Sequence, residues 1–422
     1  MAKLNVVLAR NIDSVSKSIC DFSHTVAFSH YNNLSAQLPV DKSGVIVSDK
    51  VDEQATKCMQ NIEQIITGIN HKLDDIVRLT IFATSKNDLD VIQNSVSSFF
   101  KTYKPALTLL VVNKLPLNSK VQIEAVITCG EGTIPDAPQP GDLIKLSRNT
   151  NLVFEDKNLT QTVAFSHYNH LSSQLPIDKN GNLVGSSVEE QLKQALTNVK
   201  LILNSIDVPF DDIVKLNIYT TSYENKDKIL EVHKTFFPDS AIARAVNYLP
   251  ALSIIEVKEL KLGAKVQVEA VISHGDGTPP QLVEDRHGIV IRTSSTDKAP
   301  KCCHSTQSVA FSHYNNISEI APIDLATKKL VDGSFESQLE LCLKYLNEIV
   351  LSCNHNINDV VKINFFVKNI DDYTKINGVM KKFFSGLLPA GRVIEVSNLR
   401  GDALVTIDAI VSNAEGTPPV NE

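Results

Sequence analysis

The stretch TVAFSHYNNLSAQLPVD at residues 25–41 decides the fold, because it returns as TVAFSHYNHLSSQLPID at 162–178 and as SVAFSHYNNISEIAPID at 308–324. Each copy contains the same histidine: His30, His167 and His313. Their spacings, 137 and then 146 residues, are domain lengths, whereas a solenoid repeats every roughly 20–50 residues. The sequence therefore predicts three tandem copies of one domain.

The length and the linkers agree with three domains. A chain of 422 residues is longer than one hydrophobic core usually organises. Short Gly-Thr segments followed by proline end the repeats, at 130–133, 275–278 and 415–417. Boundaries near residues 137 and 282 follow, and the predicted domains are 1–137, 138–282 and 283–422.

Each repeat shows the same switch between strand and helix periodicity. In the first repeat, strands are predicted at 5–10 and within 25–39, with a turn at Ser29-His30. Apolar residues at three- and four-residue steps predict an amphipathic helix from 51 to 69. A strand at 75–85, a second helix at 86–103 and a closing hairpin made of 106–116 and 119–130 complete the predicted unit.

The amino-acid composition argues against some classes of binding partner. Lys plus Arg is 41 and Asp plus Glu is 48, so the net charge of -7 gives no general attraction for nucleic acid or anionic membranes. No position holds a cysteine in all three repeats, which is typical of reduced thiols among the seven cysteines rather than of a disulfide framework. No apolar run has the length of a signal peptide or a membrane span. We expect a soluble, cytoplasmic protein that acts as a single chain.

Three segments resemble signatures of the Rid (YjgF-type) family of enamine/imine deaminases. LSAQLPVD at 34–41 resembles the SGQ-P-x-D motif, and DDIVRLTIF at 74–82 resembles the D-D-V-x-K strand. PALTLLVVNKLP at 105–116 with VQIEAVI at 121–127 resembles the P-A-R-S, L-P and E-I-E-A-I-A ending. The resemblance covers nearly the whole chain three times.

This resemblance implies an α+β fold of Rid-like (chorismate-mutase-like) βαβαββ domains. Family members are homotrimers with a central β-barrel, outer helices and clefts between adjacent subunits. Three fused copies would form the same closed arrangement as a monomeric, single-chain pseudo-trimer. A small apolar or amphipathic ligand in the clefts between repeats is the partner this arrangement suggests.

The resemblance also implies imine hydrolysis, in which an arginine clamps the substrate carboxylate and a nearby acid positions water. The clamp position contains Leu107 in the first repeat and Leu252 in the second. In the third repeat Gly391 is in register and Arg392 follows it. Because strand side chains alternate faces, Arg392 is expected to point away from the cleft unless a bulge re-aims it. Only a guanidinium matches a carboxylate with two parallel bonds, so no catalytic residue is expected.

Other family positions are replaced as well. The family acid corresponds to Gln122, Gln267 and Thr406. The next acids of the motif are present as Glu124, Glu269 and Asp408, and we expect them on the opposite strand face. The glycine of SGQ corresponds to Ala36, Ser173 and Glu319, and Glu319 would repel a carboxylate substrate.

Polar residues of the second strand are candidates for ligand contact or for joining the domains. Ser35, Ser172 and Ser318 match a family site position, whereas Tyr31, Tyr168 and Tyr314 are better explained by hydrogen bonds between domains. The turn histidines could meet on a threefold axis as a metal site. A turn histidine is more often a surface or hydrogen-bonding residue, so we expect no metal and no cofactor. The candidate ligand-binding residues are Tyr31, Ser35, Leu107, Gln122, Tyr168, Ser172, Leu252, Gln267, Tyr314, Ser318, Arg392 and Thr406.

Four functions remain open on these grounds. The favoured hypothesis is a non-catalytic Rid-like protein whose clefts bind a small molecule or serve as a scaffold. A surviving imine deaminase confined to one cleft, using Arg392 or Arg244, is the main alternative. A structural or storage protein is the third. An endoribonuclease, an activity attributed to some relatives, is disfavoured by the acidic balance and by the missing cluster of basic residues.

Overall fold

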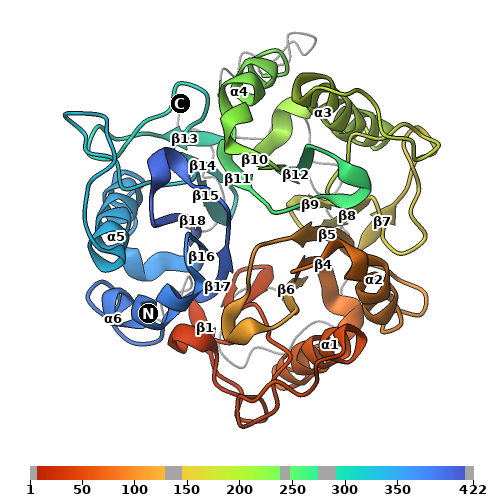
Figure 1. Cartoon of the computed structure of the whole chain (residues 1–422), viewed down its shortest axis with the longest axis horizontal. Helices are drawn as coiled ribbons and strands as arrows, with labels where there is room; N and C mark the ends of the chain where they lie inside the picture. Colours follow the sequence, from red (N-terminus) through yellow and green to blue (C-terminus); the bar gives the residue numbers. More distant parts are fainter. Residues whose placement is uncertain (1–6, 129–144, 238–247, 274–290, 414–422) are drawn as a thin grey trace, which may run out of the picture.

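The computed structural model describes residues 7–128, 145–237, 248–273 and 291–413, and places three similar units around one axis (Figure 1). Each unit contains one six-stranded sheet with helices on its outer side. The three-domain prediction is confirmed at the level of repeats. The boundaries expected near 137 and 282 lie outside the described residues.

The first repeat gives the pattern for the others. Its sheet has the order β1-β2-β3-β6-β4-β5, and its two α-helices follow β3 and β4 in the chain. The elements are β1 (Leu8–Arg10), β2 (Thr25–Phe28), β3 (Tyr31–Leu34), α1 (Val51–Thr67), β4 (Ile76–Ala83), α2 (Leu89–Ser97), β5 (Ala106–Val111) and β6 (Val121–Thr128).

The other two repeats have the same strand order. Repeat 2 contains β7 (Leu146–Arg148), β8 (Thr162–Phe165), β9 (Tyr168–Leu171), α3 (Val188–Ser205), β10 (Ile213–Thr220), α4 (Lys226–Lys234), β11 (Ala251–Glu256) and β12 (Val266–Ile272). Repeat 3 contains β13 (Arg292–Ser294), β14 (Ser308–Phe311), β15 (Tyr314–Ile317), α5 (Phe335–Ser352), β16 (Val360–Val367), α6 (Tyr373–Met380), β17 (Ala390–Glu395) and β18 (Val405–Ser412).

The predicted closing hairpin is wrong. β5 pairs in parallel with β4, and β6 pairs antiparallel with β4 on its other side, so β4 lies between the two strands. The residues between β5 and β6 include the 3-10 turn η4 (Pro116–Asn118), and the connection crosses the end of β4. Apolar patterning identifies strands but does not identify their neighbours, which is why the sequence suggested a hairpin.

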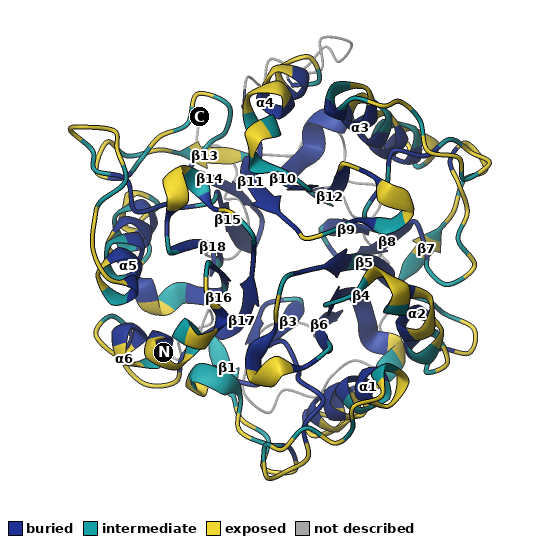
Figure 2. Cartoon of the chain, in the orientation of Figure 1, coloured by how far each residue is buried: buried dark blue, intermediate teal, exposed yellow. Residues whose placement is uncertain are grey.

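The helices cover the outer face of each sheet. In α1 the residues that face the sheet are fully buried, among them Cys58, Met59 and Ile62, while the opposite face is exposed (Figure 2). The central strand β4 is buried on both faces because helices cover one side and the other repeats cover the other, whereas the edge strands β1, β7 and β13 are partly exposed. Within the described part of the chain, no helix is both long and apolar enough to cross a membrane, and the six cysteines there are free thiols.

The three sheets close into a ring because the last strand of each sheet hydrogen-bonds to the next repeat. The bonds are equivalent around the axis: Ser173 N to Leu107 O at 3.1 Å, Glu319 N to Leu252 O at 3.0 Å, and Ala36 N to Gly391 O at 3.1 Å. One chain therefore reproduces the closed arrangement of a trimer.

The space enclosed by the three sheets is layered. One end is filled by an apolar cluster around Phe28, Phe165 and Phe311, and the other by a cluster around Phe82 and Phe366. Between them lies a charged belt, which we define as the buried residues Arg78, Glu124, Lys215, Glu269, Lys362, Arg392 and Asp408. Buried charges of this kind require close partners, which the repeats supply to one another.

Candidate functional site

Three clefts lie where adjacent repeats meet. We call them cleft 1/2, around Leu107 and Ser172; cleft 2/3, around Leu252 and Ser318; and cleft 3/1, around Gly391 and Ser35. The serine hydroxyl in each cleft accepts a hydrogen bond from the backbone amide of its neighbour, at 2.8, 2.9 and 2.9 Å in that order.

These serines join the repeats. Each hydroxyl also donates its proton to a carbonyl of its own repeat: Ser35 to Ser23, Ser172 to Thr160, and Ser318 to Thr306. A hydroxyl has one proton, so a ligand could only donate to the remaining lone pair. The structure therefore places the predicted site serines in the contacts that close the ring.

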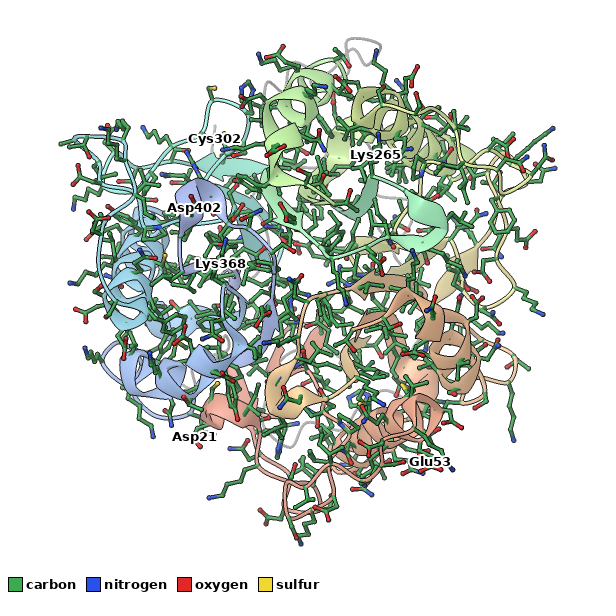
Figure 3. All side chains as sticks on the ribbon, in the orientation of Figure 1. Asp21, Glu53, Lys265, Cys302, Lys368 and Asp402 are labelled. Atoms are coloured by element: carbon green, nitrogen blue, oxygen red, sulfur yellow. The ribbon has the colours of Figure 1, made fainter. Side chains whose placement is uncertain are left out.

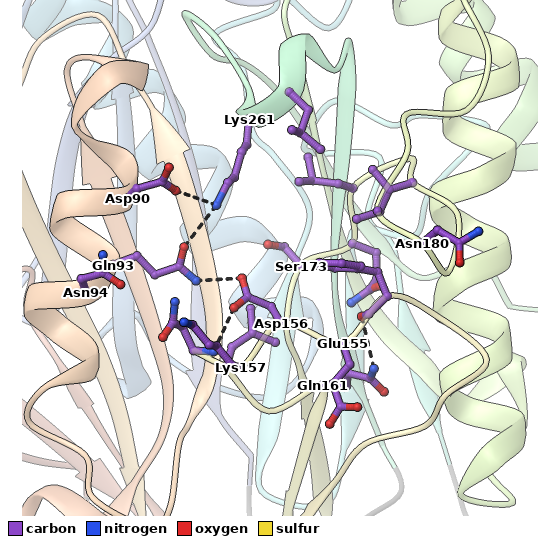
Figure 4. A pocket seen from close by; sticks show the side chains of 18 residues that line it. Asp90, Gln93, Asn94, Glu155, Asp156, Lys157, Gln161, Ser173, Asn180 and Lys261 are labelled. Atoms are coloured by element: carbon purple, nitrogen blue, oxygen red, sulfur yellow. Dashed lines mark hydrogen bonds and ion pairs between the residues drawn. The ribbon is translucent and has the colours of Figure 1, made fainter.

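Cleft 1/2 contains an open pocket of about 720 Å³ (Figure 4). Its mouth is bridged across the repeats by Gln93 of α2, whose amide donates to Asp156 Oδ2 at 2.9 Å. Lys261 of the 3-10 turn η7 (Lys261–Gly263) reaches back to Gln93 Oε1 at 3.3 Å and to Asp90 Oδ1 at 3.0 Å. Side chains from two repeats thus share one polar network around the opening.

The lining of this pocket combines amides with an apolar surface. Leu159, Leu175 and Ile177 supply apolar area, while Gln161, Ser173 and Gln174 supply donors and acceptors. Five charged residues also line the pocket: Asp90, Glu155, Asp156, Lys157 and Lys261, of which Lys261 pairs with Asp90 at 3.0 Å. Because charges of both signs are nearly balanced, the lining favours no strongly charged ligand and suits one with several hydrogen-bonding groups.

Leu107 and Leu252 do not extend into open space at these clefts. Both are nearly fully buried, and each packs into the hydrophobic core of its own repeat between sheet and helices. Leu107 lies opposite Leu79 in the parallel pair, and Leu252 lies opposite Leu216. An apolar side chain therefore occupies the clamp register in both repeats.

Cleft 3/1 is filled. The ring of Phe22, from repeat 1, lies so close to Gly391 that a Cβ there would meet ring carbons at 2.7 Å. Phe22 also stacks on Phe365 at 5.5 Å between ring centroids and joins the core of repeat 3. At the rim, Asp21 of repeat 1 (Figure 3) accepts hydrogen bonds from Asn377 and Lys381 of repeat 3. The Phe22 ring therefore occupies the space in front of Gly391 in cleft 3/1.

Cleft 2/3 carries charged groups. Burial raises the pKa of the half-buried Glu319 above the usual 4.5, although the charges of Arg400 and Lys226 act in the opposite direction. Glu319 also lies beside Thr406. Arg400 belongs to the 3-10 turn η10 (Arg400–Asp402), which corresponds to η7 in repeat 2. A carboxyl group and two cations therefore surround this cleft.

The residues at the family acid position differ in their surroundings. Gln267 donates its amide to Ser173 Oγ and so reaches cleft 1/2. Gln122 is fully buried, and neither atom of its amide has a partner among the described residues. The expectation that Glu124 lies on the opposite face from Gln122 is wrong, because residues two apart on a strand share a face. Both belong to β6 and pair with neighbouring residues of one face of β4.

Arg392 points into the barrel, not into cleft 3/1. It lies opposite Asn364, whereas Gly391 lies opposite Ile363. Its Nη1 atom donates to Glu124 Oε1 at 2.8 Å, and its guanidinium lies over the rings of Phe82 and Phe366. Placing Arg392 among ligand-binding residues therefore finds no support in this geometry. Arg244 lies outside the described residues.

Three further ion pairs complete the charged belt, and each joins two repeats. Arg78 pairs with Glu269 at 2.9 Å, Lys215 with Asp408 at 3.2 Å, and Lys362 with Glu124 at 2.8 Å. Burial alone would raise the pKa of Glu124, but the charges of Arg392 and Lys362 outweigh it and hold that pKa below the usual 4.5.

The tyrosines form a closed cycle near the axis. Tyr31 donates its hydroxyl to Phe165 O, Tyr168 to Phe311 O, and Tyr314 to Phe28 O, so each repeat is bonded to the next. Their rings, with Asn33 and His170, surround only about 40 Å³ of open volume. That space holds roughly one water molecule, so it is no site for an organic ligand.

The turn histidines also lie at the axis, which corrects the expectation of surface residues. His313 is buried, and His30 and His167 are half-buried.

The residues that distinguish the three clefts were not predicted from the sequence. Gln93, Asp156 and Lys261 lie at positions with no counterpart in the family motifs, so no signal indicated them. Phe22 could have been found, because the three repeats have Phe22, Leu159 and Ser305 at one position, and the largest of them faces the smallest residue at the clamp register, Gly391.

Comparison with known proteins gives one consistent result. A family model described as Endoribonuclease L-PSP matches three times, at residues 13–129, 156–273 and 305–413. A RutC family protein of Pyrococcus horikoshii is 31% identical over 116 residues, 27% of this chain and 92% of the relative. A 2-iminobutanoate/2-iminopropanoate deaminase of Salmonella typhimurium is 32% identical over 95 residues, 22% of this chain and 74% of the relative.

Solved structures give single-repeat matches. A Rid family protein from Yersinia pestis is 28% identical, with a TM-score of 0.29, and covers 29% of this chain and 100% of that one. RidA from an Antarctic Psychrobacter is 28% identical, with a TM-score of 0.28, and covers 29% of this chain and 99% of that one.

Proposed function

The chain belongs to the Endoribonuclease L-PSP family, which includes the Rid proteins, with one family domain in each of its three repeats, and on this basis we propose that it binds a small uncharged molecule in cleft 1/2 without hydrolysing it. The 2-iminopropanoate deaminases among its relatives indicate the ancestral chemistry. In this proposal the chain retains the fold of these enzymes, and its clefts no longer contain the residues that hydrolyse the substrate.

The observation that carries this proposal is the clamp register. Positions 107, 252 and 391 hold two buried leucines and one glycine covered by Phe22. A bidentate guanidinium–carboxylate contact contributes about 1.5–3 kcal/mol of binding and fixes the orientation of the substrate. Neither leucine nor glycine supplies these effects, so a 2-imino acid would find no such clamp at position 107, 252 or 391.

The ligand is expected in cleft 1/2 because that cleft combines volume with polar side chains whose hydrogen bonds, such as those of Gln93 and Gln161, are made within the protein and would be exchanged for bonds to a ligand. Its pocket of about 720 Å³ lies in the usual size range for small-molecule sites. Amide side chains offer both donors and acceptors, which favours hydroxyl, amide or heterocyclic groups over a charged group. The apolar side chains beneath them favour a ligand with one apolar face.

The test is a thermal-shift and calorimetric screen of the full chain with two ligand sets. One set contains uncharged polar metabolites, and the other contains 2-oxo acids, which are stable carboxylate analogues of the imino acids. We expect binding from the first set only. The variant Gln93→Leu, which copies Leu230 from the equivalent position of repeat 2, should weaken that binding about fivefold, since one bridging hydrogen bond contributes about 1 kcal/mol.

The matched control is Val91→Ala, an exposed position of the same helix that does not line the pocket. It should leave the affinity unchanged. The proposal fails if 2-oxo acids bind more tightly than every uncharged ligand, or if Gln93→Leu and Val91→Ala have the same effect.

A second candidate function, imine hydrolysis confined to cleft 2/3, is favoured by one specific observation. This cleft combines a carboxyl group with a raised pKa, Glu319, with the cations Arg400 and Lys226. A raised pKa brings a carboxyl group closer to the range useful for proton transfer near neutral pH, and a cation at the mouth could attract a carboxylate substrate.

The deciding measurement is a coupled assay in which an amino-acid oxidase generates 2-iminopropanoate. If cleft 2/3 is active, the chain accelerates hydrolysis, Arg400→Ala and Glu319→Gln abolish the acceleration, and Lys261→Ala, the equivalent change in cleft 1/2, leaves it intact. Absence of acceleration by the wild-type chain excludes the second candidate and agrees with the first.

A further inference from the structure

Three histidines converge at one end of the barrel, one from each repeat. His30, His167 and His313 follow serines at the β2–β3, β8–β9 and β14–β15 turns. Their ring centroids are 5.3, 4.8 and 5.2 Å apart. One potential ligand nitrogen from each ring lies within 4.8 Å of the other two. Residues separated by a domain length in sequence thus present three imidazoles to one point.

The turn geometry is the same in all three repeats and aims the rings inward. The residue before each histidine, Ser29, Ser166 or Ser312, has a positive φ of 50°, 51° or 48°. A positive φ costs conformational free energy in residues other than glycine, so contacts with the surrounding structure must stabilise these turns. The same strained turn occurs in all three hairpins, so each repeat orients its histidine in the same way.

The environment leaves one imidazole nitrogen of His313 in need of a partner. His313 is 7% exposed, and its Nδ1 has no hydrogen-bond partner among the described residues. The rings of Phe28, Phe165 and Phe311 lie edge-on at 6.4 to 6.5 Å on the barrel side. Aromatic carbon offers no hydrogen bond, so a buried nitrogen there is costly unless something else binds it. A neutral imidazole has the lone pair that a transition metal requires.

We propose that His30, His167 and His313 form a three-histidine site for one divalent transition-metal ion, with Zn²⁺ as the expected occupant. Zinc–nitrogen bonds of about 2.0–2.1 Å place three nitrogens of a tetrahedral site about 3.3 Å apart. From separations of at most 4.8 Å, each nitrogen must move inward by roughly 0.8 Å or less, which ring rotation supplies.

Such a site would tie the three repeats together at one atom. Each ligand comes from a different repeat, so an ion that binds only the closed ring stabilises that ring. Because His30 and His167 are half-buried, the fourth coordination position faces solvent, as in zinc sites that hold a water molecule. The site lies on the axis and shares no residue with the clefts.

The experiment is a titration of chelator-treated full chain with Co²⁺, whose visible spectrum reports four-coordinate nitrogen ligation, and with Zn²⁺ by calorimetry. We expect one equivalent of metal and a rise in Tm of roughly 3 °C when the free ion is about 100-fold above Kd. His167→Ala should weaken binding at least about 100-fold.

Two controls separate this site from other binders. His355→Ala removes a histidine outside the ring, and Cys302→Ser with Cys303→Ser removes two thiols of the segment between β13 and β14; both should leave the affinity unchanged. No uptake by the wild-type chain, or uptake that the cysteine variant loses and His167→Ala keeps, overturns the proposal. Should His167→Ala fail to fold, anomalous diffraction from the Co²⁺-loaded wild-type chain decides, with density on the axis supporting the site and density elsewhere refuting it.

Discussion

The axis of the barrel and the clefts at its edge have diverged to different extents. At the axis the three repeats have the same residues: a phenylalanine, a serine, a histidine and a tyrosine in each hairpin. In the clefts, equivalent positions hold Phe22, Leu159 and Ser305. A side chain on the axis contacts its two counterparts, so a change there must suit three repeats. A side chain in a cleft meets one neighbouring repeat and can change alone.

The largest expected effect tests this contrast directly. Glu124→Ala leaves Arg392 and Lys362 buried without their carboxylate, and such a loss costs about 3–5 kcal/mol of unfolding free energy. The cleft substitution Gln267→Ala, which removes one hydrogen bond to Ser173, should cost about 1 kcal/mol. Urea denaturation of both variants measures the difference. Equal losses would mean that the axis is no more constrained than the clefts.

Opening cleft 3/1 should have the next largest effect. Phe22→Ala removes a ring buried in the core of repeat 3 and should cost about 3 kcal/mol while leaving a cavity beside Gly391. Phe22→Leu copies Leu159 and should cost roughly 1 kcal/mol. Thermal unfolding gives the stabilities, and recovery of Tm on adding benzene would show that the cavity accepts a ligand. An unchanged Tm in Phe22→Ala would show that the ring does not hold these repeats together.

Acid should reduce the advantage of the charged belt. The folded-state pKa of Glu124 lies below its usual 4.5, so its stabilising contribution is complete above that value and is lost as the pH falls through the lowered pKa. The difference in unfolding free energy between the wild-type chain and Glu124→Gln should therefore be constant near neutral pH. It should shrink below about pH 4.5, by about 1.4 kcal/mol for each pH unit until the pH reaches the lowered pKa of Glu124. A gap that widens in acid would contradict the assigned sign.

The smallest effect concerns the tyrosine cycle. Tyr168→Phe removes one hydrogen bond to Phe311 O and should cost about 1 kcal/mol. Because the rings of the three tyrosines are in contact, the double variant with Tyr314→Phe should differ from the sum of the single changes by at least about 0.5 kcal/mol. Additive losses would indicate three independent bonds and would weaken the argument that axial residues are coupled.

The sequence predicted the repeats and the helices, because these follow from self-comparison and local periodicity. The replacement of the clamp depends on the resemblance to the Rid family and stays a prediction. It did not predict that β4 separates β5 from β6, since strand order depends on contacts between distant segments. The sequence does show that Phe22 is the largest of the three equivalent residues, but its contact with Gly391, 369 positions away, depends on how the repeats pack. The proximity of Leu107 and Ser172 was accessible only through the resemblance to a trimeric family.

The guanidinium of Arg392 shows what a single chain permits that a trimer of identical subunits does not. The equivalent residues of the other repeats are Thr108 and Ser253, whose hydroxyls donate to Glu269 and Asp408. In three identical subunits, one codon change would place three guanidiniums in the charged belt, where their mutual repulsion in a poorly screened interior would oppose assembly. Gene fusion lets such a mutation enter once, and the protein can then evolve an asymmetric interior one repeat at a time.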